Sequence, residues 1–189
     1  MDAGLARRDD AIPPAPAIPP ALLDRIWSTP QVRLRERVLW LLLHESGAPI
    51  RAVLALDVEN LDLDDRRARA RGAWVSWRAR TAQLLPELVA DRIRGPLFLT
   101  DRRPGPTRTI APNDLCPQTG RSRLSYERAE YLFKQHMRTL EPSGTGYTLR
   151  QLRSSADATA LDVGQARNRW NTVGTTPSID HEGRAGAGP

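Results

Sequence analysis

Two arginines that share one predicted helix could bind a phosphate group. Arg150 and Arg153 lie three residues apart in the stretch Leu149–Ser155, and residues at this spacing lie on similar sides of a helix. A planar guanidinium donates two parallel hydrogen bonds to phosphate oxygens. The pair therefore predicts a phosphate contact, and the alternative interpretation is that each arginine makes an ordinary salt bridge within the fold.

Nucleophiles and metal ligands are few in this sequence. Cys116 is the only cysteine, which excludes a disulfide within the chain and a zinc site built from several cysteines. The three tyrosines, Tyr126, Tyr131 and Tyr147, all precede the arginine pair. His44 follows three leucines in an apolar helical stretch, and we expect it to be structural. No metal and no cofactor are expected.

The charge of the chain favours a polyanionic partner. The formal net charge is +6 and the sequence pI is about 10.5. Between Leu61 and Glu130, 14 arginines stand against 9 acidic residues. GC-rich coding can explain why Lys134 is the only lysine, but it does not explain the positive surplus. The usual partner of such a surface is nucleic acid, and a solvated face is the alternative.

The chain has the length of one ordinary domain and no membrane signal. Its 189 residues, 40% of them hydrophobic, are enough to bury a core. The longest apolar run, Val38–Leu43, is far shorter than the roughly 20 residues needed to span a bilayer. The N-terminus has acidic residues and prolines in place of a signal peptide. We expect a cytoplasmic protein without a membrane partner.

Apolar periodicity and capping residues predict a mostly helical fold. Gly47 is the expected end of one helix, Ser125 and Thr148 are expected N-caps, and Pro86 is expected in the first turn of its helix. The predicted helices span residues 21–28, 31–46, 50–56, 85–94, 125–140 and 148–163.

A small antiparallel sheet is predicted in the middle of the chain. Residues 61–71 and 73–77 are predicted strands with a turn at Gly72, and residues 78–84 are a candidate extension of the sheet. Trp74 and Trp77 are three apart on a strand, so alternation places them on opposite faces. We therefore expect one of them in the core and the other at its boundary. The fold class is α+β.

Composition divides the chain into three parts. Residues 1–20 are rich in proline and alanine and predict a disordered arm. Residues 21–164 hold the predicted elements, including a long surface connection over residues 101–123 with at most one helical turn. Residues 165–189 have no helical stripe and predict a flexible tail.

Three stretches resemble the tyrosine recombinases of the phage-integrase type. Ser46–Asp62 is similar to the box that leads from a turn to the first catalytic arginine of that family. Leu149–Ser155, followed by Gly164, resembles its His-x-Leu-Arg-His helix, and Gly95–Phe98 resembles its Pro-Leu-Phe segment. The resemblance implies an integrase-like catalytic domain that is incomplete at its C-terminus, and it implies double-stranded DNA as the partner.

The resemblance also implies a specific chemistry. In the family, a tyrosine hydroxyl attacks a DNA phosphodiester, two arginines bind the non-bridging oxygens of the transition state, and histidine or lysine groups move protons. The first catalytic arginine falls at Pro49 here, which has no charge. Arg51 is two residues further on, about 200° around a helix, and cannot replace it directly.

The second half of the catalytic set is also depleted. Arg153 matches the second catalytic arginine, but Arg150 stands in place of the family's first histidine and Ser154 in place of the next. Arginine does not give up its proton at neutral pH. No tyrosine follows Gly164, and no lysine lies near Gly72. The resemblance thus implies a DNA-binding domain that does not cleave DNA, with Arg150 and Arg153 as its phosphate contacts.

Other functions remain open at this point. The chain could be an interaction module that pairs with an intact recombinase protomer, or a decayed remnant of a gene with marginal stability. A third alternative is an active enzyme with relocated residues that uses Tyr147 as its nucleophile. This enzyme would have to replace an arginine, a lysine, two histidines and a tyrosine together, which is a strong requirement because catalytic groups act as a unit.

Overall fold

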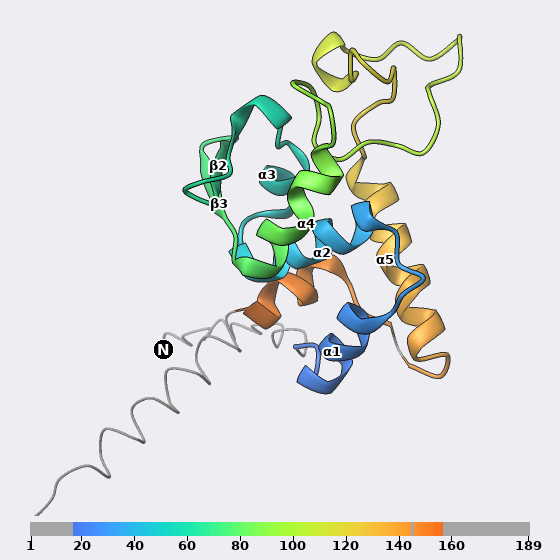
Figure 1. Cartoon of the computed structure of the whole chain (residues 1–189). Coiled ribbons are helices and arrows are strands. Elements are labelled where there is room, and N and C mark those ends of the chain that lie inside the picture. The colour runs from blue at the N-terminus through green and yellow to red at the C-terminus, as the bar shows by residue number, and fades with distance from the viewer. Residues whose placement is uncertain (1–16, 145, 157–189) are drawn as a thin grey trace, which may run out of the picture.

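The computed structural model describes residues 17–144 and 146–156 and contains helices around a central helix with a small sheet at one side (Figure 1). The last helix within the described residues covers residues 149–156. The other elements, in chain order, are α1 (Pro20–Ser28), α2 (Leu34–Ser46), α3 (Ile50–Leu54), the 3-10 turn η1 (Val58–Asn60), β1 (Leu61–Asp62), β2 (Arg67–Ala70), β3 (Ala73–Ser76), α4 (Ala79–Val89), the 3-10 turn η2 (Pro112–Asp114) and α5 (Tyr126–Leu140). The predicted α+β class is confirmed.

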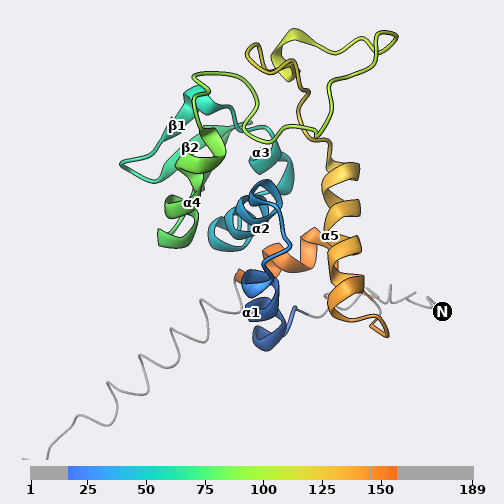
Figure 2. The same cartoon turned by 45° about the vertical axis from the view of Figure 1, so that its right-hand side comes forward.

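The central helix is α2, and other helices surround it (Figures 1 and 2). Every residue from Val38 to Leu43 is buried, as expected of a helix that is covered on all sides. Gly47 ends the helix as predicted: it adopts the left-handed conformation at φ 59°, and its N–H donates to the carbonyl of Leu43 at 3.2 Å.

The sheet has three antiparallel strands in the order β1-β2-β3. The strand predicted over residues 61–71 is interrupted, because residues 63–66 form a turn in which Asp62 accepts the Asp65 N–H at 2.9 Å. The turn predicted at Gly72 is confirmed, with φ at +76°. Trp77 is 5% exposed, which confirms the predicted core tryptophan, but Trp74 is 59% exposed and lies on the surface instead of at the boundary of the core.

The prediction for residues 78–84 was wrong. They begin helix α4 instead of extending the sheet, and Pro86 lies near the end of this helix, not in its first turn. Thr81 and Leu85 are one helical turn apart and both buried, and α4 packs against α2 through this face. The first half of α4 is polar in sequence, so no apolar periodicity predicted a helix there. Its burial depends on the contact with α2.

Two helix starts follow their predicted caps. The Ser125 hydroxyl accepts the Arg128 N–H at 3.2 Å at the start of α5. The Thr148 hydroxyl accepts the Gln151 N–H at 3.2 Å, and the Gln151 side chain accepts the Thr148 N–H at 3.0 Å, which is a reciprocal capping box. Residues 157–163 of the predicted last helix, Gly164 and the tail 165–189 lie outside the described residues.

The disordered arm predicted over residues 1–20 includes residues that belong to the fold. Ile18 is 2% exposed, and its N–H donates to the Ser155 hydroxyl at 3.0 Å; Pro20 already belongs to α1. The boundary expected at residue 20 is therefore wrong by a few residues, because an isoleucine among prolines packs into the core. Residues 1–16 lie outside the described part. Among the described helices, none combines the length and apolar character needed to cross a membrane.

Candidate nucleic-acid interface

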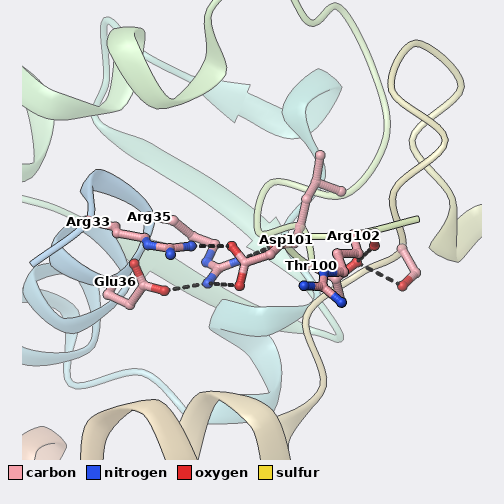
Figure 3. Close-up of polar contacts among 8 residues, drawn as sticks. Arg33, Arg35, Glu36, Thr100, Asp101 and Arg102 are labelled. Carbon is pink, nitrogen blue, oxygen red and sulfur yellow. Dashed lines mark hydrogen bonds and ion pairs between the residues drawn. The ribbon is translucent and has the colours of Figure 1, made fainter. Parts of the chain in front are cut away.

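Four charged side chains form a connected group where α2 begins (Figure 3). Asp101 accepts hydrogen bonds from Arg33 at 2.8 Å and is 3.1 Å from the Arg35 guanidinium. Arg35 also pairs with Glu36 and donates to the Leu99 carbonyl at 2.6 Å. Arg35 and Glu36 are nearly buried, so this group attaches the segment after Leu99 to α2.

The Asp101 carboxyl remains ionised in this group. Burial raises its pKa, but the nearby charges of Arg35, Arg33 and Arg128 outweigh burial, and the pKa of Asp101 lies below its usual value. The carboxylate therefore balances part of the positive charge at this place.

A hollow of about 660 Å³ opens beside Asp101. We call it the arginine hollow, because six arginines line it and Asp101 is its one acidic lining residue. The hydroxyl-bearing residues Thr100, Ser122 and Ser125 also line it. The arginines are Arg33, Arg102, Arg103, Arg108, Arg123 and Arg128.

The hollow is built by the two ends of the long connection 101–123 and by the start of α5. Thr100 and Ser122 hold the ends together: the Thr100 N–H donates to the Ser122 carbonyl at 2.8 Å, and their hydroxyls are 3.1 Å apart. Figures 1 and 2 show the connection extending beyond the N-terminal end of α5. At the start of α5, the Ser125 hydroxyl accepts the N–H of Arg128 at 3.2 Å.

Arg123 has a structural role in the wall of the hollow. Its guanidinium donates to Asp57 and Asp114, each at 2.7 Å, and to the carbonyls of Leu54 and Leu56 at 3.2 Å. Burial disfavours its charge, but the hydrogen bonds with Asp114 and Asp57 outweigh burial and raise the pKa of Arg123. This arginine is fully occupied within the fold and is not available to a ligand.

The other arginines leave charge available. Within residues 17–144 and 146–156, the guanidinium groups of Arg102 and Arg108 have no hydrogen bond or ion pair. Of the Arg103 guanidinium, only Nε forms a hydrogen bond among the described residues; it donates to the Thr119 carbonyl at 2.8 Å. Arg128 lies over the Tyr131 ring at 5.1 Å. Four guanidiniums around one hollow, against one carboxylate that is already paired, favour an anionic ligand.

The residues predicted from the sequence lie elsewhere. Arg150 is exposed and Arg153 is half-buried on helix 149–156, which Leu149 and Leu152 anchor in the core. Figures 1 and 2 place this helix beside α1, on the other side of α2 from α3 and the long connection. In the described part of the chain, neither arginine has an ion pair, so the salt-bridge interpretation finds no partner there.

Pro49 and Ser154, two positions that the resemblance singled out, carry no charged side chain. Pro49 is exposed at the N-cap of α3, and Ser154 is exposed on helix 149–156. Tyr147 packs against the hydrophobic core and is half-buried. His44 is mainly affected by burial, which lowers its pKa, and a hydrogen bond with the backbone of Leu152 opposes this; it joins two helices, as a structural histidine would.

No family model, curated protein or solved structure matches this chain. In the described residues, no group of three or more His, Cys, Asp or Glu side chains is placed to hold a metal ion.

Sequence reasoning missed the arginine hollow. The surplus of arginine between Leu61 and Glu130 was the available signal, but it did not say which arginines come together. Arg33 and Arg128 are far apart in the chain and both line the hollow. Their proximity depends on the docking of the long connection, which no local pattern shows.

Proposed function

We propose that this chain binds double-stranded DNA through the arginine hollow and does not cleave it. The observation that carries the proposal is the group formed by Arg102, Arg103, Arg108 and Arg128, which line one hollow and form no ion pair among the described residues. Guanidinium groups suit phosphate oxygens, and contacts of this kind supply most of the sequence-independent affinity for DNA. They orient the duplex without reading its sequence.

The tyrosine recombinase resemblance supports the choice of DNA as the anion. The described order is three helices, a small sheet, helix α4, a long connection and two more helices, and the resemblance implies a helix pair before the sheet and two helices after the connection. We therefore propose an integrase-like domain that retains DNA affinity. Arg150 and Arg153 are proposed as a second phosphate contact, on helix 149–156.

The absence of cleavage is proposed from the chemistry of the replaced residues. Pro49 and Ser154 cannot hold a phosphorane oxygen by charge, and Arg150 cannot transfer a proton at neutral pH. We expect no covalent protein–DNA adduct after incubation with duplex DNA and denaturing electrophoresis. An adduct that disappears in Tyr147→Phe would instead identify an active enzyme with a relocated nucleophile.

The binding proposal is tested by fluorescence anisotropy with a labelled blunt duplex over a series of salt concentrations. The wild type is expected to bind with a steep salt dependence. Arg102→Ala with Arg108→Ala should bind more weakly, and the slope of log K against log salt should fall by about two, one for each lost phosphate contact.

The matched control is Arg80→Ala with Arg138→Ala, which removes the same charge from exposed positions outside the hollow. If this control weakens binding as much as the hollow variant does, the site is not the hollow. A folded wild type that does not bind the duplex at low salt would overturn the proposed function.

A further inference from the structure

A large aromatic side chain lies on the solvent face of the sheet. Trp74 in β3 is 59% exposed, although Val75, its neighbour in the strand, is fully buried. Alternation explains the difference, because successive side chains of a strand point to opposite faces. Trp77, three residues further on, shows that this part of the chain can bury an indole. The indole of Trp74 is therefore not part of the hydrophobic core, and alternation leaves it on the exposed face.

Two arginines of the adjacent strand accompany the ring. Arg69 is the direct partner of Trp74 in the β2–β3 register, and its Cζ is 5.9 Å from the ring centroid. The Cζ of Arg67 is 5.2 Å from the same centroid. Arg67 is also paired with Asp65 at 2.6 Å, but in the described residues Arg69 has no carboxylate partner.

The edge of this face is open. The turn that joins β2 to β3 consists of Arg71 and Gly72, both with positive φ, and Arg71 is exposed. A Cβ placed on Gly72 would have no atom within 4 Å. The tip of the hairpin is therefore unobstructed at Gly72, two residues before Trp74 in the chain, while Arg67 and Arg69 flank the indole.

We propose that Trp74, with Arg67 and Arg69, is a stacking platform for an unpaired nucleobase of single-stranded DNA. A base stacks on an indole whatever its identity, and the flanking guanidiniums suit the phosphates on either side of it. The same arrangement of π face and positive charge is unsuited to a neutral apolar partner, because the cations would lose their water.

This platform extends the proposed function to a second surface and does not depend on the arginine hollow. In both Figure 1 and Figure 2 the hairpin β2–β3 lies on the opposite side of the molecule from α5, whose start borders the hollow. The two surfaces can therefore be tested separately, one with blunt duplex and the other with single strands.

The test measures binding of a labelled oligo(dT) of about 15 nucleotides by anisotropy, together with quenching of tryptophan emission. Trp74→Ala is expected to bind this strand about five- to hundredfold more weakly than the wild type. Trp74→Phe should retain most of the affinity, because phenylalanine also stacks, but it should lose the quenching. Arg69→Gln should weaken binding with quenching retained. Circular dichroism verifies that each variant is folded.

The outcomes separate the inference from the proposed function. If Trp74→Ala binds the single strand as tightly as the wild type does, or if the wild type shows no quenching, the platform is overturned and Trp74 serves only the hairpin. If single-strand binding depends on Trp74 but blunt duplex does not bind, the platform stands and the duplex proposal fails. Tighter Trp74-dependent binding of oligo(U) than of oligo(dT) would overturn the assignment to DNA in favour of RNA.

Discussion

Arg123 donates a hydrogen bond to Asp57 at 2.7 Å and so joins two parts of the chain that are 66 positions apart. The same guanidinium bonds to Asp114 at 2.7 Å. One side chain thus fixes the returning end of the long connection to the segment that follows α3. The wall of the arginine hollow is held by an arginine that is itself unavailable for binding.

Removal of the Arg123 side chain should destabilise the fold. In Arg123→Ala, Asp57 and Asp114 lose their partner, and the carbonyls of Leu54 and Leu56 lose a donor. We expect a loss of about 2–3 kcal/mol in the free energy of unfolding, as for a partly buried ion pair broken on one side. Urea denaturation followed by circular dichroism measures it. Arg121→Ala, at an exposed position, is the control; an equal effect of both variants would show that Arg123 has no special role.

Stability should fall as the pH is lowered below about 6.5. Burial lowers the pKa of both His44 and His136 below the usual value of 6.5. The unfolded chain therefore takes up protons first, and each histidine favours unfolding below the unfolded-state pKa. Above the unfolded-state pKa both histidines are neutral in the folded and the unfolded chain, so neither of them lowers the free energy of unfolding. The pKa of Asp101 is lowered from 3.8, so this group changes the stability only at more acidic pH.

The pH effect is measured by urea denaturation at about pH 7.5 and about pH 5.5. His136→Gln should reduce the difference between the two free energies of unfolding, because it removes one of the two half-buried histidines whose pKa is lowered. A difference that is unchanged in this variant would show that His136 titrates normally in the folded state.

The cap of α5 is expected to matter for the whole fold. Ser125→Ala removes the acceptor of the Arg128 N–H, and loss of such a cap costs about 1 kcal/mol. Ser125→Asp should keep most of the stability, because aspartate also caps helices. Thermal unfolding monitored at the helical signal compares them. Ser143→Ala, at an exposed turn position, is the control and should be neutral; if Ser125→Ala is neutral too, the cap is not formed in solution.

The second phosphate contact is tested with Arg150→Ala combined with Arg153→Ala. We expect weaker binding of blunt duplex and a salt slope reduced by about two. Because helix 149–156 lies apart from the hollow, its effect should add to that of Arg102→Ala with Arg108→Ala. The anisotropy titration described for the hollow measures both. Binding equal to the wild type would restrict the interface to the hollow.

Local signals predicted much of the fold. Gly47, Ser125 and Thr148 end or begin helices where expected, since caps act on N–H and carbonyl groups within one turn. The alternation that separates Trp74 from Trp77 is likewise a property of one strand. The failures at Ile18 and at the start of α4 have one cause: burial against a distant element overrode a local composition that is polar or rich in proline.

The sequence by itself determined the α+β class, most helix boundaries, the hairpin turn at Gly72 and the positive charge, because each depends on neighbours within a few residues or on composition alone. Only the tertiary structure decided which charges act together. Arg33, Arg102 and Arg128 meet because Asp101 and Arg123 dock the long connection onto α2 and the end of α3. It also decided which tryptophan is exposed, since alternation separates two faces, but only packing against the helices buries one of them.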